Sequence, residues 1–233
     1  MLRITQKKGK PSIILPSVDQ IHEFQELLLE WHSQNYRDFP WRNESSSCYE
    51  KIIAEILLQR TKAETVAKVF TAFLTRFQSW EKIVESSNED LEYYLRPLGL
   101  WKRRSISIRK LAIEMNKREG VFPSSRRNLE ELPNIGQYIA NAVLLLCYGE
   151  PNPLLDINMA RVLERYFGPR KLVDIRDDPY LQSLSYKVIA HDDPVLMNWA
   201  ILDLSMLICK PTPLSKICPL VKKCHYATMH ESS

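Results

Sequence analysis

The chain has 233 residues, a formal net charge of +4 and 26 % charged residues, values typical of one globular domain or two small ones. This weakly basic charge permits a nucleic-acid partner without requiring one, and no apolar run reaches the roughly 18 residues of a membrane span. No secretory signal is recognisable, so we expect a protein of the cytoplasm or nucleus that is not secreted. The five cysteines then favour a metal site or free thiols over disulfides.

Apolar residues recur at helical spacing along most of the chain. Residues 1 to about 17 are the exception: they lack this period and include Pro11 and Pro16, so we expect an extended arm there. Proline and glycine separate the periodic segments from one another. Helices are predicted at about 19–31, 49–60, 63–76, 80–86, 88–96, 102–118, 127–131, 137–148, 157–167, 178–190 and 194–208. Alternating strand patterns are rare, and the predicted fold class is all-α.

A tight turn is predicted between the helices at about 127–131 and 137–148. Residues 132–140 read Leu-Pro-Asn-Ile-Gly-Gln-Tyr-Ile-Ala. A turn of this kind exposes backbone N–H groups at a helix N-terminus, where the helix dipole also favours an anion such as phosphate. The alternative is an ordinary connection between two helices, which commonly contains glycine.

Two carboxylates occupy positions that suit catalysis, and each also has an ordinary structural explanation. Asp156, in the sequence Leu-Asp-Ile-Asn-Met-Ala-Arg-Val, directly precedes a predicted helix and could be its N-cap. Glu55 lies on a predicted helix that is apolar around most of its circumference. One polar stripe runs along that helix, and it either faces water or lines a cleft; it consists of Lys51, Glu55, Gln59 and Lys62.

Three segments together resemble the endonuclease III and MutY families of DNA glycosylases, over roughly residues 24–227. Residues 132–140 resemble the family hairpin Leu-Pro-Gly-Val-Gly-x-x-Thr-Ala, and residues 155–162 resemble Val-Asp-x-Asn-x-x-Arg-Val. Residues 55–61 resemble Glu-x-x-Leu-Gln-Gln-Thr of MutY and Glu-x-Leu-Leu-Arg-Arg-Thr of thymine-mismatch glycosylases. Asn134 departs from the family glycine, but asparagine tolerates positive φ, so the turn is expected to form.

The resemblance implies a helix-hairpin-helix fold with two helical modules. Residues 46–147 would form one module, with the hairpin at about 127–147. Residues 1–45 and 148–233 would form the other, which ends in a cysteine-containing loop at 209–224. DNA would bind in the cleft between the modules, and one base would be flipped out of the duplex into it.

The resemblance also assigns roles to individual residues. Asp156 would stabilise the oxocarbenium-like sugar or activate water, and Glu55 would hydrogen-bond or protonate the base or position the water. Gln59 would push into the base stack. Leu100 would form an apolar wedge in the minor groove, although core packing is an alternative. The implied DNA-contacting set is Gln59, Leu100, Ile135, Gly136, Gln137 and Asn158.

Tyr138 bears on the type of reaction. Bifunctional members of the family have a lysine at this position, which attacks the sugar and forms a Schiff base. Tyrosine has no amine, so the resemblance implies a monofunctional hydrolase that leaves an abasic site. Thymine-mismatch glycosylases related to MutY also have tyrosine here, whereas MutY usually has serine.

The length of the chain also bears on the substrate. It ends nine residues after Cys224, where MutY continues into a domain that reads 8-oxoguanine. We therefore expect excision of thymine or uracil opposite guanine from double-stranded DNA by a monomer without a membrane partner. Two alternatives stay open: removal of adenine opposite guanine or 8-oxoguanine, and a non-catalytic DNA-binding module.

Cys209, Cys218 and Cys224 fall where the family binds a [4Fe–4S] cluster with the spacing C-x6-C-x2-C-x5-C. The last two cysteines fit this spacing, but the second ligand is missing and Ser215 stands three residues before Cys218. A cluster needs four ligands, normally all thiolates. Ser215, His225 or a water would have to complete the site, or the loop has lost its metal. A cluster here would be structural, and the chemistry needs no cofactor.

Overall fold

The structure is a computed structural model that describes residues 13–230, and this part of the chain consists of helices and loops without a strand. The predicted all-α class is therefore confirmed. None of the helices in this part is both long and apolar enough to cross a membrane. In chain order the elements are α1 (Val18–Asn35), η1 (Pro40–Arg42), α2 (Cys48–Leu58), α3 (Ala63–Arg76), α4 (Trp80–Glu85), α5 (Asn88–Leu95), η2 (Arg96–Leu98), α6 (Trp101–Lys117), α7 (Arg126–Glu130), α8 (Gln137–Tyr148), α9 (Ile157–Phe167), α10 (Pro179–Ile189), α11 (Pro194–Leu207), η3 (Ser215–Ile217), η4 (Val221–Lys223) and α12 (His225–His230).

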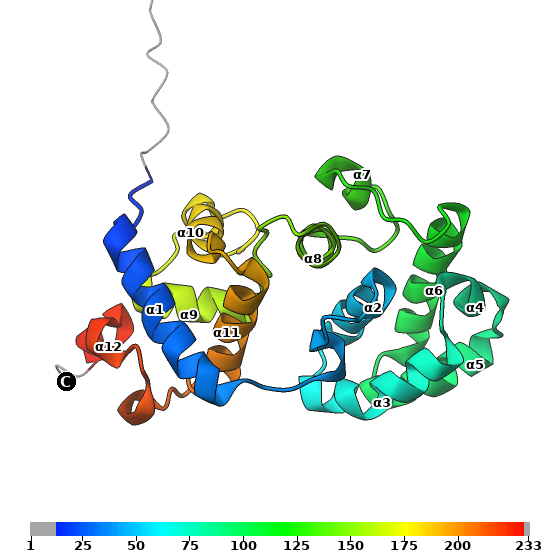
Figure 1. Cartoon of the computed structure of the whole chain (residues 1–233), viewed down its shortest axis with the longest axis horizontal. Helices are drawn as coiled ribbons and strands as arrows, with labels where there is room; N and C mark the ends of the chain where they lie inside the picture. Colours follow the sequence, from blue (N-terminus) through cyan, green and yellow to red (C-terminus); the bar gives the residue numbers. More distant parts are fainter. Residues whose placement is uncertain (1–12, 231–233) are drawn as a thin grey trace, which may run out of the picture.

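The helices form two groups (Figure 1). Helices α2 to α6 come from the middle of the chain and pack around one another on one side, and α7 joins this group through its packing on α8. Helix α1 packs with α9, α10 and α11, and α12 packs on α9, so the two ends of the described chain meet on the other side. Helix α8 contacts α2 and α7 in the first group and α11 in the second. This helix therefore links the groups, and its first residues lie where they meet.

The helix ends follow directly from the local sequence. Ser17 and Ser47 form capping boxes with Gln20 and Glu50, in which each serine accepts a backbone N–H and each N3 side chain accepts the serine's own N–H. These pairings satisfy donors that a helix N-terminus otherwise leaves without a partner. At the other end of α8, Gly149 has φ 71, a left-handed conformation that glycine adopts without steric cost.

The predicted boundaries differ from the structure at the end of α1, which continues to Asn35 rather than ending at about residue 31, and at the end of α2. The apolar period predicts a helix to about residue 60, but α2 ends at Leu58, and Gln59 and Arg60 form a turn in which Arg60 has φ 58. Residues 13–17 are not helical, as expected, and the rest of the predicted N-terminal arm lies outside the described residues. The 3-10 turns and α12 were not predicted, because each is too short to show a helical period.

The cysteine prediction was wrong for one pair. Cys48 and Cys147 form a disulfide, while Cys209, Cys218 and Cys224 are free. The prediction rested on the cysteine count and on the compartment expected from the sequence, whereas the bond depends on two side chains that meet only after folding. The disulfide joins the start of α2 to the end of α8, which are packed against each other.

Reduction of this disulfide is expected to lower stability. The bond spans 99 residues of sequence. A cross-link over a loop of that length lowers the conformational entropy of the unfolded chain, which raises the free energy of unfolding by about 4.7 kcal/mol in the loop-entropy treatment. Thermal unfolding followed by circular dichroism should show a lower melting temperature with reductant and in Cys48→Ser. Reductant should have no further effect on Cys48→Ser. Equal melting temperatures for the oxidised and reduced protein would contradict the assignment.

Candidate active site

A cavity of about 1020 Å³ lies between the two helix groups. Its lining comes from the α2–α3 turn, the N-terminal ends of α6, α8 and α9, and one face of α11. Residues predicted from four separate segments of the chain meet here, namely Glu55, Gln59, Leu100, Gly136, Gln137, Tyr138, Asp156 and Asn158. The predicted polar stripe therefore does not simply face bulk water, since Glu55 on α2 and Gln59 and Lys62 in the turn after it all line the cavity.

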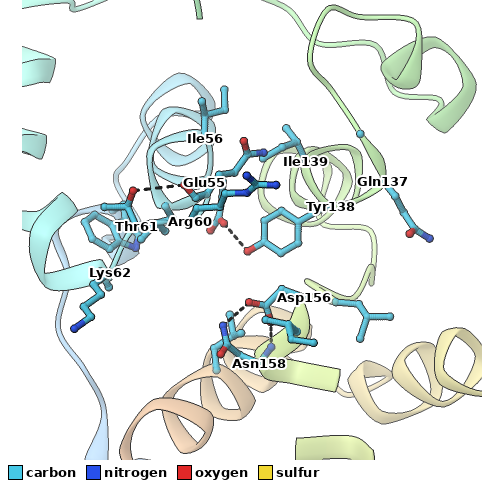
Figure 2. Close-up of a pocket in the computed structure, with 18 of the residues that line it drawn as sticks. Glu55, Ile56, Arg60, Thr61, Lys62, Gln137, Tyr138, Ile139, Asp156 and Asn158 are labelled. Carbon is cyan, nitrogen blue, oxygen red and sulfur yellow. Dashed lines mark hydrogen bonds between the residues drawn. The ribbon is translucent and has the colours of Figure 1, made fainter. Parts of the chain in front are cut away.

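Glu55, which is buried, and Tyr138, which is half-buried, form a pair in the cavity wall (Figure 2). The Tyr138 hydroxyl donates to Glu55 Oε2 at 2.8 Å, and only 5 % of Glu55 is exposed. Burial raises the pKa of Glu55 to about 7, opposed by the Tyr138 hydrogen bond and the positive charge of Arg42. In a large fraction of the molecules, Glu55 is therefore a neutral carboxylic acid near neutral pH. This form donates a hydrogen bond or a proton.

Asp156 is at once the N-cap of α9 and part of the cavity lining, so the two explanations of this residue are compatible. Its Oδ1 accepts the backbone N–H groups of Asn158 and Met159 at 2.9 and 2.8 Å. Its Oδ2 accepts the Asn158 side-chain amide at 2.6 Å (Figure 2). Arg161 in turn donates to Asn158 Oδ1 at 3.2 Å. These bonds fix the carboxylate across the cavity from the Glu55–Tyr138 pair.

The geometry gives Asn158 a structural role beside its predicted contact with DNA. The resemblance placed it among the DNA contacts, but both polar ends of its side chain already have partners, Asp156 at one end and Arg161 at the other. A side chain held in this way orients the carboxylate beside it. Direct contact with DNA stays a prediction.

The hairpin between α7 and α8 has the expected form. Asn134 has φ 61, which confirms that asparagine adopts the left-handed conformation of the family glycine. Gly136 is the N-cap of α8, and because it has no side chain, none caps the first N–H groups of the helix. These donors are available to an anion. Gln137 lines the cavity, but its amide already donates to Gln182 Oε1 at 2.9 Å.

The side chain of Ile135 is buried, and its predicted contact with DNA stays a prediction. Only 5 % of Ile135 is exposed, and its N–H donates to the Leu132 carbonyl at 3.2 Å inside the turn. The residue anchors the hairpin to the apolar core, because its aliphatic side chain is more stable there than in water. The motif therefore marks the position of the hairpin, and the Ile135 side chain packs the turn against the apolar core.

Leu100 and Gln59 both line the cavity and are exposed to solvent. Leu100 is 58 % exposed, which argues against core packing and leaves its apolar side chain free. It has φ 50 and lies directly before α6. Gln59 is exposed in the turn that follows α2. The two turns are adjacent, since Thr61 Oγ1 donates to the carbonyl of Leu98 at 3.3 Å.

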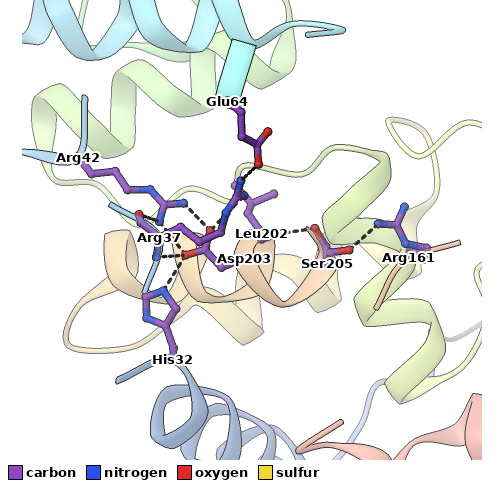
Figure 3. Close-up of polar contacts among 8 residues, drawn as sticks. All are labelled: His32, Arg37, Arg42, Glu64, Arg161, Leu202, Asp203 and Ser205. Atoms are coloured by element: carbon purple, nitrogen blue, oxygen red, sulfur yellow. Dashed lines mark hydrogen bonds and ion pairs between the residues drawn. The ribbon is translucent and has the colours of Figure 1, made fainter. Parts of the chain in front are cut away.

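One part of the site was missed in the sequence. Arg42 pairs with Asp203 through both carboxylate oxygens at 2.7 and 2.9 Å, and His32 lies 3.0 Å from the same carboxylate (Figure 3). Asp203 is fully buried, yet these partners lower its pKa. Arg42 also lines the cavity, and its Nε has no hydrogen-bond partner. The Pro-Trp dipeptide before Arg42 was a signal for this segment, but no spacing rule pairs residues 161 positions apart.

The free cysteines do not form a complete four-thiolate site. Cys209 accepts from Arg165 Nη1 at 3.5 Å, and Cys224 Sγ donates to the Arg165 carbonyl at 3.2 Å. Burial raises the pKa of Cys218 and Cys224, which favours the neutral thiol over the thiolate that binds metal. Within residues 13–230, no group of three or more His, Cys, Asp or Glu side chains is arranged to hold a metal ion. An iron–sulfur cluster stays a prediction from the resemblance alone.

Comparison with known proteins identifies the family. Residues 53–176, more than half of the chain, match the model of the HhH-GPD superfamily base excision DNA repair proteins. A thymine-DNA glycosylase of Aeropyrum pernix is 33 % identical over 213 residues, which is 89 % of this chain and 95 % of that protein. A thymine/uracil-DNA glycosylase of Pyrobaculum aerophilum is 30 % identical over 90 % of this chain and 93 % of its own.

A solved structure agrees with these relatives. The structure of a thermostable thymine-DNA glycosylase superposes with a TM-score of 0.83 at 28 % identity, covering 91 % of this chain and 98 % of its own. The chain belongs to the HhH-GPD superfamily of base excision DNA repair proteins.

Proposed function

We propose that this protein is a monofunctional DNA glycosylase that excises thymine or uracil opposite guanine and leaves an abasic site. The observation that carries the proposal is that the Asp156 carboxylate and the Glu55–Tyr138 pair line one cavity, to which the hairpin before α8 also contributes. A cavity of about 1020 Å³ is large enough for a flipped nucleotide. The names of the relatives support the choice of base.

The two acids suit the two charges that develop during cleavage of the glycosidic bond. Positive charge develops on the sugar, and the Asp156 carboxylate, already fixed by three hydrogen bonds, would stabilise it without reorganising. Negative charge develops on the leaving base. Glu55 in its neutral form would donate a hydrogen bond or a proton to it. Tyr138 uses its hydroxyl on Oε2, which leaves Oε1 for the base.

Single-turnover assays on duplexes with one mismatch each would test the proposal. We expect release of thymine or uracil opposite guanine, and none from the fully paired duplex. Duplexes with adenine opposite guanine or 8-oxoguanine test the adenine alternative, which faster release from these would favour. Mismatch binding without release of any base would instead support the non-catalytic module.

No covalent intermediate is expected. Tyr138 has no amine, and the lysine that lines the cavity, Lys62, is exposed at the start of α3, whereas Schiff-base formation needs an amine positioned at the sugar carbon. Borohydride added during turnover should therefore trap no protein–DNA adduct, and Tyr138→Lys should gain trapping. Efficient trapping by the natural protein would contradict the monofunctional assignment, and its loss in Lys62→Ala would identify the amine.

A further inference from the structure

Arg104, near the start of α6, is hydrogen-bonded to both of the turns that carry Gln59 and Leu100. Its Nε donates to the Gly99 carbonyl at 3.0 Å, beside Leu100. Its Nη2 donates to the Gln59 carbonyl at 2.5 Å and to Thr61 Oγ1 at 2.6 Å. Its Nη1 reaches the carbonyls of Ile56 and Leu57 at 3.3 and 3.4 Å.

These contacts account for the whole hydrogen-bonding capacity of the side chain. A guanidinium has five N–H donors in a rigid planar fork, and five acceptors of the protein surround this one. Four of the acceptors belong to the C-terminal end of α2 and the turn after it, where the last carbonyls of a helix lack intrahelical partners. The adjacent Arg103 is exposed in the same cavity lining. Arg104 therefore has no donor left for a phosphate, unlike an exposed neighbour.

The backbone conformation at both turns explains why the hydrogen bonds of Arg104 are needed. Arg60 has φ 58 and Leu100 has φ 50, a sparsely populated conformation for residues with a side chain, which persists only where the surroundings hold it. Among residues 13–230, only two other non-glycine residues have positive φ, Glu119 and Asn134. Arg104 bonds to the residue just before each of the two strained positions, Gln59 in one turn and Gly99 in the other.

We infer that Arg104 is a positioning residue that joins the Gln59 turn and the Leu100 loop into one rigid wedge, on which extrusion of a paired base depends. The inference rests on the proposed function and on the roles that the family resemblance implies for Gln59 and Leu100, whose side chains would enter the duplex. Unpairing and unstacking a base costs free energy, and the cost is smallest for a base that is already unpaired. Loss of the wedge should therefore impair excision of a paired base much more than excision of an unpaired one.

The test compares two duplexes that contain uracil, opposite guanine in one and opposite an abasic spacer in the other. Arg104→Ala should lower the single-turnover rate by roughly tenfold or more with the paired uracil and by less than about threefold with the unpaired one. A 2-aminopurine beside a non-hydrolysable 2′-fluorinated deoxyuridine should brighten on binding of the natural protein and much less with the variant. Arg104→Lys keeps the charge but has three donors, so we expect a smaller loss with the same selectivity.

Arg109 provides a matched control on the same helix. It donates to the carbonyls of Ile83 and Val84 at the end of α4 at 2.9 and 3.2 Å and does not line the cavity. Arg109→Ala should lower the melting temperature without changing the ratio of the two rates. If Arg104→Ala does not fold, the ratio of the two rates is measured with Arg104→Lys instead. An equal loss on both duplexes, or no loss, would overturn the inference, whereas natural protein inactive on both would count against the proposed function instead.

Discussion

Asp156→Asn is expected to nearly abolish base release, by roughly a thousandfold or more in single-turnover rate, while the protein folds normally and binds mismatch DNA. Asparagine is as good an N-cap as aspartate, so it can still accept the N–H groups of Asn158 and Met159. What it lacks is the negative charge beside the cationic sugar. The substitution thus separates the two roles that the structure combines in this residue.

Rates and melting temperatures measured together test this interpretation. Asp193, the N-cap of α11, accepts from Leu196 N at 2.8 Å and lies outside the cavity lining. Asp193→Asn makes the same chemical change at a cap that serves only structure, and we expect its rate to be unchanged. Base release by Asp156→Asn at a rate near that of the natural protein would leave Asp156 as a helix cap alone.

Glu55→Gln is expected to slow base release by roughly a hundredfold, within the range usual for a general acid, and to change the pH profile. The carboxyl is neutral below its pKa of about 7 and ionised above it. If the neutral form assists the leaving base, the rate of the natural protein falls as the pH rises through 7. The amide of glutamine does not titrate, so this fall should be absent in Glu55→Gln.

The direction of the profile distinguishes the roles that remain open for Glu55. A rate that rises with pH through 7 would instead indicate a carboxylate that activates water. Glu50→Gln, in the first turn of the same helix and outside the cavity lining, is the matched control and should keep the natural profile. Glu55→Gln should not destabilise the fold, because an amide buried beside the Tyr138 hydroxyl can still accept its hydrogen bond and involves no buried charge. An unchanged rate and profile would exclude Glu55 from the chemistry.

The sequence alone determined the features that depend on neighbouring residues. The helical period predicted α-helices along the chain because one face of each is buried, and short motifs located the hairpin and Asp156 because a cap or a tight turn needs particular residues at fixed spacing. Glu55 was located by the polar stripe on an otherwise apolar helix. Asn134 belongs here too, since its tolerance of positive φ is a property of the residue itself.

Only the tertiary structure decided which of these residues meet, and in what environment. The raised pKa of Glu55 comes from burial and from partners elsewhere in the chain, among them Tyr138 at a distance of 83 residues. Arg42 and Asp203, Cys48 and Cys147, and Arg104 with the end of α2 are likewise joined only by folding. Their sequence positions show no period or spacing, because packing between helices, rather than local geometry, brings them together.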